Sequence, residues 1–267
     1  MKIGFIGAGN MGGAILSGLL ASGIVPSGDV MISQSTPERT ERRAAEFGVM
    51  PAASSSDLVR QCQIIFLGVE PGVIPSVLEE IKLVYYNRKI IISMAAGIMV
   101  DSIEKILGKD AKVIRIMPNT PAKVGESMIS MSRNGNVSDG EMEEAAQILS
   151  TIGKTEEVPE DMIHAVIGVS GSSPAYTYMY IQGLADAAVA QGMDPAKARA
   201  FAAQAVLGAA KIVQETDRPL DDLIAEVCTP GGTTYEAVTY FLEHGLRELV
   251  KSGADAAIRR SKEMSRA

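Results

Sequence analysis

A glycine-rich turn near the start of the chain constrains the fold most strongly. Residues 7–12 read Gly-Ala-Gly-Asn-Met-Gly, directly after the strand-like run KIGFI and directly before a stretch with helical spacing, residues 11–21. In this order the first glycine permits a tight turn, the second lets the backbone approach a pyrophosphate, and the third lets the helix pack closely on the strand. The N–H groups at the helix start then face the anion. We predict a dinucleotide-binding turn, the alternative being a plain glycine-rich turn.

The first part of the chain alternates between strand-like and helical patterns. The runs DVMIS, IIFLGV, KIIISM and KVIRIM follow KIGFI, and a segment with helical spacing comes after each of them. Nearly all-apolar strands that alternate with helices predict a parallel sheet covered by helices on both faces. We therefore assign residues 1–158 to an NAD(P)-binding, Rossmann-like, doubly wound α/β domain.

The amino-acid composition changes after residue 158. From Asp161 onward β-branched runs disappear and alanine dominates, as in GLADAAVAQG and KARAFAAQAVLGAAKIV. Alanine has the best helix propensity and lets helices approach one another closely. We predict that residues 159–267 form an all-helical domain shared between subunits of a homodimer or higher homo-oligomer.

Composition excludes several classes of function. The formal net charge of −7 argues against a nucleic-acid or anionic-membrane partner. No run of about 18 apolar residues suggests a membrane span. The two cysteines, Cys62 and Cys228, and the two histidines, His164 and His244, lack the spacing of metal ligands, so we predict no metal site. We expect a soluble protein of the reducing cytoplasm.

The end of the second strand bears on the choice of cofactor. A site that prefers NAD usually has Asp or Glu there, to hold the ribose 2′-hydroxyl. This chain has Ser-Gln-Ser-Thr at residues 33–36 and Arg39 shortly after. Hydroxyl, amide and guanidinium donors suit a 2′-phosphate. We predict that NADP(H) is preferred and that NAD(H) is the alternative; for Arg39 the alternative is a solvated helix face.

Two further strand ends are candidate walls of the same site. Residues 68–71, Gly-Val-Glu-Pro, follow IIFL, and residues 93–97, Ser-Met-Ala-Ala-Gly, follow the next apolar run. Ligands of open α/β sheets bind outside the carboxyl ends of the strands. We predict that these turns surround the ribose and nicotinamide, the alternative being ordinary turns.

Four motifs in order carry a family resemblance. After the glycine turn come MPNTPA at residues 117–122, SGSSPAY at 170–176 and TPGGTT at 229–234. Over essentially its whole length the chain resembles the pyrroline-5-carboxylate reductases, which reduce a cyclic imine to L-proline with NAD(P)H. The resemblance implies an active site built from the nucleotide domain of one subunit and helices of both. The chain departs from the family pattern at Glu70, where lysine is usual, and at Thr229, where serine is usual.

The threonine loop, residues 229–234, interrupts the helical half. Thr233 and Glu236 fit a capping box, so a helix should begin at Thr233 as N-cap. The Pro-Gly-Gly approach leaves backbone N–H groups bare, and a helix N-terminus with bare donors is an anion site. The resemblance implies that this loop holds the substrate carboxylate and that Thr234 lies beside the ring nitrogen. A well-capped turn without a ligand is the alternative.

The expected chemistry needs little acid strength, because a cyclic imine is readily protonated in water. The enzyme has to orient the imine, hydrogen-bond its nitrogen and exclude solvent. We predict Thr234 as the catalytic hydrogen-bonding residue, although its hydroxyl is too weak an acid to be the proton source. The predicted substrate contacts are Thr229, Gly231, Gly232, Thr233 and Thr234. The predicted cofactor contacts are Ile6, Gly7, Ala8, Gly9, Asn10, Met11, Gln34, Ser35, Arg39, Ser55, Gly68, Val69, Glu70, Pro71, Ala95, Ala96, Gly97 and Asn119.

Two other functions are compatible with parts of this pattern. β-Hydroxy acid dehydrogenases share this layout, but they depend on a lysine in the helix between the domains, and residues 162–196 contain no lysine. A module that binds NADPH without catalysis would leave the threonine loop idle. Retained nucleotide binding without turnover would be its signature.

Overall fold

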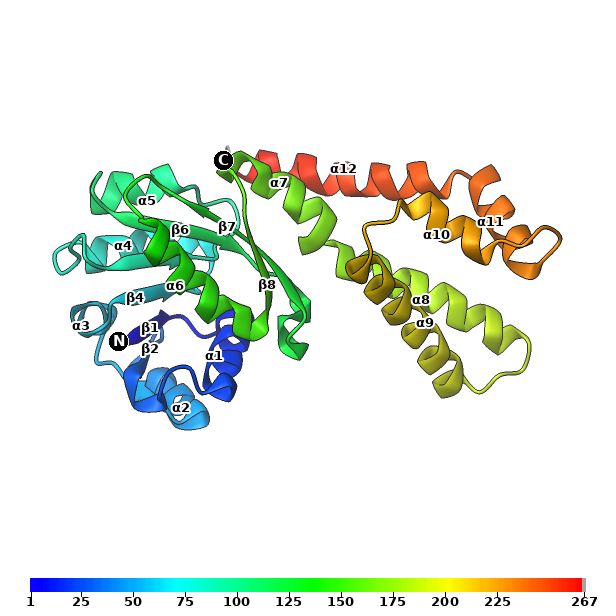
Figure 1. Cartoon of the computed structure of the whole chain (residues 1–267). Coiled ribbons are helices and arrows are strands. Elements are labelled where there is room, and N and C mark those ends of the chain that lie inside the picture. The colour runs from blue at the N-terminus through cyan, green and yellow to red at the C-terminus, as the bar shows by residue number, and fades with distance from the viewer. Residues whose placement is uncertain (266–267) are drawn as a thin grey trace. The chain divides into compact units, whose positions relative to one another are not determined.

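The computed structural model describes residues 1–265, and these fall into two compact units. The first unit is Met1–Gly171 together with the C-terminal residues from Ala257 onward, and the second is Ser172–Ala256. Figure 1 shows a sheet with helices in the first unit and helices alone in the second. The boundary predicted at 158/159 falls just after the last strand, while the first unit continues to Gly171.

The first unit is built on an eight-stranded sheet with the order β3-β2-β1-β4-β5-β6-β7-β8. Its strands are β1 (Ile3–Ile6), β2 (Val30–Ser33), β3 (Met50–Pro51), β4 (Ile64–Leu67), β5 (Ile90–Ser93), β6 (Lys112–Met117), β7 (Ser127–Arg133) and β8 (Gly153–Glu157). Strands β1 to β6 are mutually parallel, as predicted, but β7 is antiparallel to β6, and β8 is parallel to β7. The five strands predicted from the sequence, β1, β2, β4, β5 and β6, all lie in the parallel part, and β7 and β8 extend the sheet beyond it. The connection from β6 to β7 spans only residues 118–126, which is shorter than a parallel crossover usually needs.

Helices cover both faces of this sheet, which confirms the predicted doubly wound class. They are α1 (Asn10–Ser22), α2 (Pro37–Phe47), α3 (Ser55–Gln61), α4 (Ile74–Ile81), α5 (Val100–Leu107) and α6 (Asp139–Leu149). Residues of α1, α2 and α6 share one buried apolar cluster with the sheet, and residues of α3, α4 and α5 share the other.

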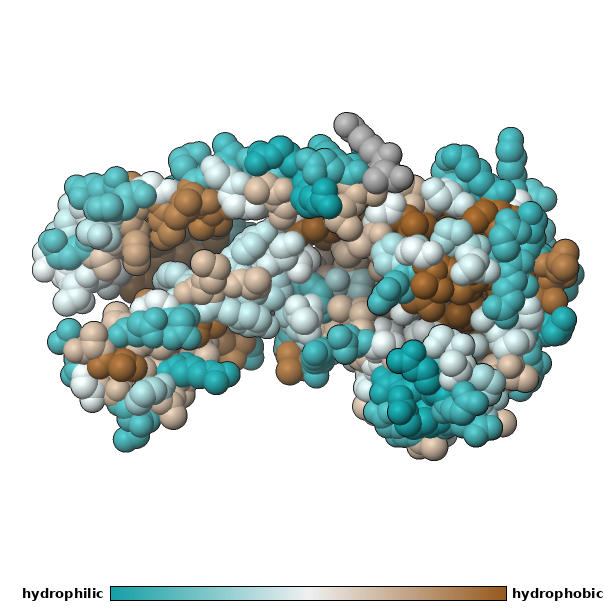
Figure 2. Space-filling view, turned by 180° about the vertical axis from the view of Figure 1, so that it is seen from behind, coloured by the Kyte–Doolittle hydropathy of each residue, from teal (hydrophilic) through white to brown (hydrophobic). Residues whose placement is uncertain are grey.

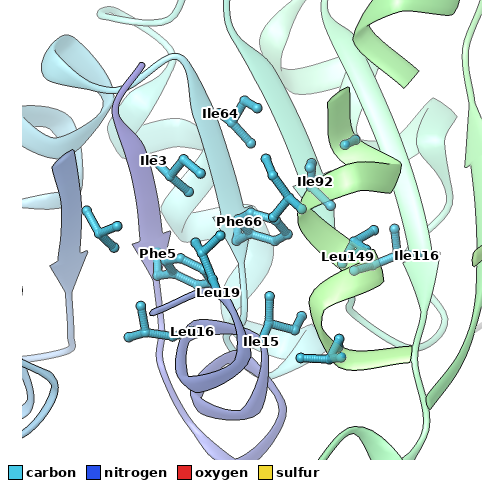
Figure 3. Packing of buried hydrophobic residues seen from close by; sticks show 14 of the residues in the cluster. Ile3, Phe5, Ile15, Leu16, Leu19, Ile64, Phe66, Ile92, Ile116 and Leu149 are labelled. Carbon is cyan, nitrogen blue, oxygen red and sulfur yellow. The ribbon is translucent and has the colours of Figure 1, made fainter. Parts of the chain in front are cut away.

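Figure 3 shows the first of these clusters, with the side chains of α1 and α6 against the strands. At its centre Phe5 of β1 and Phe66 of β4 stack with ring centroids 4.7 Å apart. Each fully buried aromatic or branched aliphatic side chain contributes about 1.5–3 kcal/mol relative to an exposed one. These two clusters hold the strands in register, so the loops at the carboxyl ends of the strands have a fixed base.

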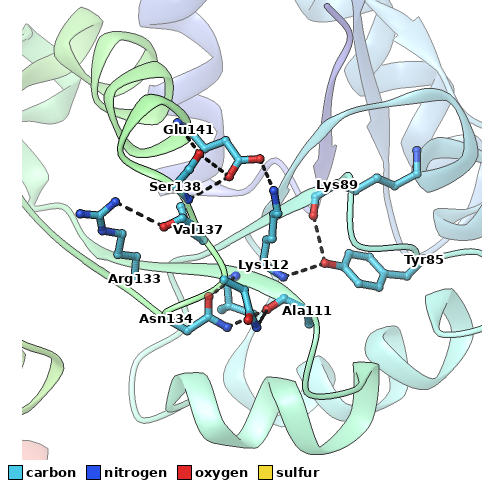
Figure 4. A network of polar contacts seen from close by, with 11 residues as sticks. Tyr85, Lys89, Ala111, Lys112, Arg133, Asn134, Val137, Ser138 and Glu141 are labelled. Carbon is cyan, nitrogen blue, oxygen red and sulfur yellow. Dashed lines mark hydrogen bonds and ion pairs between the residues drawn. The ribbon is translucent and has the colours of Figure 1, made fainter.

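A polar network closes the amino end of β6 (Figure 4). The Tyr85 hydroxyl donates to the carbonyl of Lys89 and accepts from the backbone N–H of Lys112, both at 2.9 Å. Burial raises the pKa of Tyr85 to about 12, so the phenol stays protonated at neutral pH. The Lys112 ammonium in turn pairs with Glu141 at the start of α6. This end of the strand is therefore occupied by the protein's own polar groups, and the carboxyl edge is left for a ligand.

The second unit consists of helices. They are α8 (Ser173–Ala190), α9 (Pro195–Glu215), α10 (Leu220–Val227), α11 (Thr233–Glu243) and α12 (Leu246–Met264), of which α12 returns to the first unit from Ala257 onward. Its buried cluster is small, with Ala185, Ala198 and Ala202 at the α8–α9 contact. Large apolar side chains are exposed instead, among them Met179 and Phe201, and Figure 2 shows this apolar surface in brown. Among residues 1–265, no helix combines the length and apolar character that crossing a membrane requires.

Candidate active site

Three glycines allow a close crossing of backbone beside β1. Gly7 has a φ of 85°, a left-handed conformation that glycine adopts freely. A Cβ atom on Gly68 would lie 2.3 Å from the carbonyl oxygen of Gly7, and one on Gly12 would lie 2.7 Å from the same oxygen. The turn after β1, the first turn of α1 and the end of β4 can meet only because none of these residues has a side chain.

The next glycine of the motif faces open space. A Cβ atom on Gly9 would meet no atom within 4 Å. Gly9 is also the N-cap of α1, and no side chain caps this helix start. The backbone N–H groups of the first turn are therefore available to an anion. Gly9 leaves the kind of space that the pyrophosphate of a dinucleotide would fill.

A cavity of about 790 Å³ opens beside this turn, at the carboxyl edge of the sheet. Among the predicted cofactor contacts it is lined by Ile6, Gly7, Ala8, Gly9, Asn10, Gln34, Ser35, Arg39, Ser55, Gly68, Val69 and Glu70. It is also lined by residues that the sequence did not single out as contacts: Ser33, Arg42, Arg43, Val73, Ser76, Val77 and Glu80. The structure thus gathers the ends of β1, β2 and β4 and residues of α2, α3 and α4 around one cavity.

The start of α2 presents cationic and hydroxyl groups to this cavity. Thr36 caps the helix by accepting a hydrogen bond from the backbone N–H of Arg39. The Arg39 guanidinium donates to the Ser35 hydroxyl at 3.1 Å. Arg39 is exposed and lines the cavity, so the arginine faces the site and the solvent at once.

Gln34 adds an unused donor at the end of β2. Its backbone N–H donates to the Thr40 hydroxyl at 2.9 Å, which fixes the residue against α2. Its side-chain Nε2 atom is buried and has no hydrogen-bond partner among the described residues. A buried amide without a partner is costly, so a ligand that accepts its hydrogen bond would be stabilised here. Together with the open space at Gly9, this observation fits a bound dinucleotide.

The cavity is not uniformly positive. Glu70, at the end of β4, and Glu80, on α4, also line it. Arg43 lines it too, but this arginine is paired with Glu46 and donates to the carbonyl of Ala8. Arg39 and Arg42 are therefore the cationic side chains of the lining for which no carboxylate partner within the described residues is recorded.

The other predicted cofactor contacts do not line this cavity. They are Met11, Pro71, Ala95, Ala96, Gly97 and Asn119, and all of them follow the carboxyl ends of strands. Ala95 is buried in the cluster of α3, α4 and α5. Gly97 has a φ of 79°, and a Cβ atom on it would lie 3.3 Å from the carbonyl oxygen of Met264. The end of α12 therefore packs against the turn after β5, a contact that no local sequence signal reveals.

The N-cap of the helix that follows the threonine loop differs from the predicted one. Helix α11 begins at Thr233, but its N-cap is Gly232, and no side-chain capping bond is made. The predicted capping box of Thr233 and Glu236 was therefore wrong. Gly232 has extended backbone angles (φ −83°, ψ 165°), which suit an N-cap, and its N–H donates to the carbonyl of Thr229 at 2.9 Å. Thr233 is exposed and Thr234 is half-buried, and neither hydroxyl is used to cap the helix.

The fold and the cavity define a class of protein. Residues 2–97 match the family model described as NADP oxidoreductase coenzyme F420-dependent. Residues 160–264 match the model described as pyrroline-5-carboxylate reductase dimerisation. A doubly wound sheet with a glycine cradle, followed by a helical unit, is thus the architecture of a dinucleotide-dependent oxidoreductase.

Comparison with known proteins narrows the class. The chain is 43% identical over 265 residues to the pyrroline-5-carboxylate reductase of Escherichia coli (strain K12), which covers 99% of this chain and 98% of that protein. The structure of a pyrroline-5-carboxylate reductase from Coxiella burnetii matches with a TM-score of 0.92 and 32% identity, over 99% of this chain and 98% of that one. The Plasmodium falciparum pyrroline carboxylate reductase with NADP bound matches with a TM-score of 0.89 and 28% identity, with the same coverage. The chain belongs to the pyrroline-5-carboxylate reductase family.

Proposed function

We propose that this protein reduces 1-pyrroline-5-carboxylate to L-proline, the last step of proline biosynthesis, with NADPH as the preferred cofactor and NADH as the alternative. One observation carries the proposal: this chain, which has a glycine-rich turn of the dinucleotide-binding type, aligns over 99% of its length with a pyrroline-5-carboxylate reductase. The Plasmodium falciparum relative, whose structure holds NADP, supports the choice of cofactor.

The residues of the cavity account for cofactor binding in this proposal. The bare N–H groups after Gly9 bind the pyrophosphate, and the Gln34 amide and the Arg39 guanidinium bind the adenosine end with its 2′-phosphate. When bound, the cofactor supplies the hydride that the imine carbon accepts. The nicotinamide ring lies beyond the next strand end, beside the small side chain of Ala96.

The threonine loop and the first turn of α11 account for substrate binding. The N–H groups of the first turn of α11, which have no intrahelical partner, bind the carboxylate of the imino acid, each charge-assisted hydrogen bond contributing about 1.5–3 kcal/mol. The Thr234 hydroxyl can donate to a neutral ring nitrogen or accept from a protonated one. Because solvent supplies the proton, this hydroxyl has only to hold the nitrogen in place.

We further propose a homodimer or higher homo-oligomer that works in the cytoplasm. The family model that matches residues 160–264 is named for dimerisation. The exposed apolar side chains of α8 to α12, such as Tyr178, Phe201 and Leu249, support a subunit interface there. Light scattering of the purified protein should give at least twice the mass of one chain, and a monomer at micromolar concentration would contradict the proposal.

The decisive assay mixes the purified protein with 1-pyrroline-5-carboxylate and either NADPH or NADH, and follows the absorbance of the reduced nicotinamide. We expect substrate-dependent oxidation with both cofactors, and faster oxidation with NADPH at low concentration. If neither cofactor is oxidised in the presence of the imine, the proposed function is wrong.

The Arg39→Ala variant tests the cofactor preference. Removing the guanidinium should raise the Kd for NADPH roughly tenfold, because a charge-assisted hydrogen bond to phosphate is lost at an exposed position. The Kd for NADH should stay within about twofold. Arg88→Ala is the matched control, since Arg88 is exposed and does not line the cavity. Equal losses for both cofactors would mean that Arg39 binds a part common to NADPH and NADH.

A further inference from the structure

A buried arginine on β6 pairs with a carboxylate that follows β8. Arg115 is fully buried, and its Nη1 atom donates to the Glu160 carboxylate at 3.0 Å and lies 2.9 Å from the sulfur of Met99. Its Nε and Nη2 atoms have no hydrogen-bond partner among the described residues. A buried charge is costly unless an opposite charge lies beside it. Arg115 therefore holds the Glu160 side chain at this position.

The carboxylate oxygen that accepts from Arg115 also accepts from α5. Glu160 begins the short helix η5 (Glu160–Met162), and its Oε1 atom accepts from the backbone N–H of Val100 at 2.9 Å. Val100 is the first residue of α5, so its N–H has no partner inside the helix. The N-cap, Met99, makes no side-chain capping bond, and Val100 is buried. Glu160 thus caps α5 from 60 residues further along the chain.

This cap fixes one end of the turn after β5, residues 94–99. The bonds recorded inside the turn are long: the N–H of Ala95 lies 3.4 Å from the Ser93 hydroxyl oxygen, and the N–H of Ile98 lies 3.4 Å from the carbonyl of Ala95. Typical N–H···O bonds measure about 2.9–3.0 Å. The turn is therefore placed mainly by its neighbours, and the capping carboxylate is one of them. Three of the predicted cofactor contacts, residues 95–97, lie in this turn.

We propose that Glu160, held by Arg115, is a positioning residue for the cofactor: its bond to Val100 fixes the turn 94–99, beside which the nicotinamide ring binds. The proposal rests on the proposed function in placing the nicotinamide there. All the residues that it involves belong to the first unit. Without the bond, the turn spends less time in the conformation that binds the ring, and the affinity for NADPH falls by that fraction. The adenosine and pyrophosphate bind elsewhere in the cavity, so their contribution should not change.

The first test compares two ligands in full-length Glu160→Ala. We expect the Kd for NADPH to rise roughly tenfold, which corresponds to the loss of a hydrogen bond to a charged group. The Kd for 2′-phospho-ADP-ribose, which is the cofactor without its nicotinamide, should stay at the wild-type value. A general loss of stability would weaken the binding of both ligands. Fluorescence titration measures NADPH binding, and isothermal titration calorimetry measures binding of the fragment.

The Val100→Pro variant removes the donor instead of the acceptor and leaves the ion pair intact. Proline has no N–H, and its fixed φ suits the first position of a helix. The preceding residue, Met99, already has the extended angles (φ −83°, ψ 155°) that a residue before proline prefers. We expect the same selective rise in the Kd for NADPH, with a smaller drop in melting temperature than in Glu160→Ala, because Arg115 keeps its counter-ion. This variant also serves if Glu160→Ala does not fold.

The Glu160→Gln variant keeps an acceptor oxygen for α5 but loses the charge. It should therefore retain most of the affinity for NADPH, although its melting temperature should fall because Arg115 loses its counter-ion. Glu141→Gln is the matched control (Figure 4), since Glu141 pairs with Lys112 at the other end of β6 and accepts from the N–H of Ser138 at the start of α6. It should bind NADPH as the wild type does.

Hydrogen exchange tests the proposal without a ligand. Amides of residues 95–102 should exchange faster in Glu160→Ala than in wild type or Glu141→Gln. Neither binding nor exchange requires imine reduction, so these readouts are valid even if the assay with 1-pyrroline-5-carboxylate fails. Equal losses of affinity for NADPH and for the fragment would overturn the positioning role. So would wild-type affinity and exchange in both Glu160→Ala and Val100→Pro, or a loss of NADPH affinity in Glu160→Gln as large as that in Glu160→Ala.

Discussion

Gly68→Ala should weaken NADPH binding at least about 100-fold and lower the melting temperature. The added Cβ atom would lie 2.3 Å from the carbonyl oxygen of Gly7 and 3.6 Å from the Cα of Gly12. Because the nearest atom belongs to the backbone, no side chain can move to make room, and the turn after β1 has to shift. Overpacking of this kind typically costs about 1–3 kcal/mol of stability. The affinity for NADPH should fall in addition, because the cofactor binds to this turn.

Calorimetric melting and fluorescence titration with NADPH check both parts of this result. Gly72→Ala is the matched control, since a Cβ atom at Gly72 would meet no atom within 4 Å. Gly9→Ala separates folding from binding. Its Cβ atom also meets no protein atom within 4 Å, so the melting temperature should hold while the methyl group obstructs the cradle. Wild-type NADPH affinity in Gly68→Ala would show that the turn does not bind the cofactor as we propose.

The parallel part of the fold could be predicted because its strands are buried on both faces. The runs at β1, β4 and β5 are almost entirely apolar, and this pattern carries over to burial of every residue in those strands. Strand β7 gave no such signal. Its serines Ser127, Ser130 and Ser132 are buried, so polar residues occupy positions that are usually apolar. Strand β8 lies at the sheet edge and is largely exposed and charged, as edge strands often are.

Some residues of the candidate site could likewise be predicted from the sequence, and others could not. The glycine turn could be predicted, because its glycines meet a local backbone requirement that is visible within the six residues 7–12. Arg42 left a weaker signal: it follows Arg39 by three positions on α2, which places both on neighbouring parts of one helix face. Glu80 and Ser76 line the cavity from α4, and only the fold brings residues of that helix and of the end of β2 to one cavity. The capping of α11 was misassigned because a glycine and a threonine are both acceptable N-caps, and they stand side by side.

The Thr234→Val variant should lower kcat at least about tenfold, and up to about 100-fold, while the Kd for NADPH stays within about twofold. Valine has nearly the shape of threonine but no hydroxyl, so the ring nitrogen of the substrate loses its hydrogen bond while the loop keeps its packing. A hydrogen bond to a charged group is worth about 1.5–3 kcal/mol, which corresponds to this range. Thr234 is half-buried at the first turn of α11, so its hydroxyl has less water to replace the lost partner than an exposed one would have.

Steady-state kinetics at saturating NADPH and a separate binding titration measure the two quantities. Thr239→Val is the matched control, because Thr239 is a half-buried threonine of the same helix outside the loop, and it should leave kcat near the wild-type value. Thr234→Ser keeps the hydroxyl and should retain most of the turnover. If NADPH affinity falls in Thr234→Val while kcat is preserved, Thr234 faces the cofactor instead of the imine. The loop then has to be reassigned from the substrate to the dinucleotide.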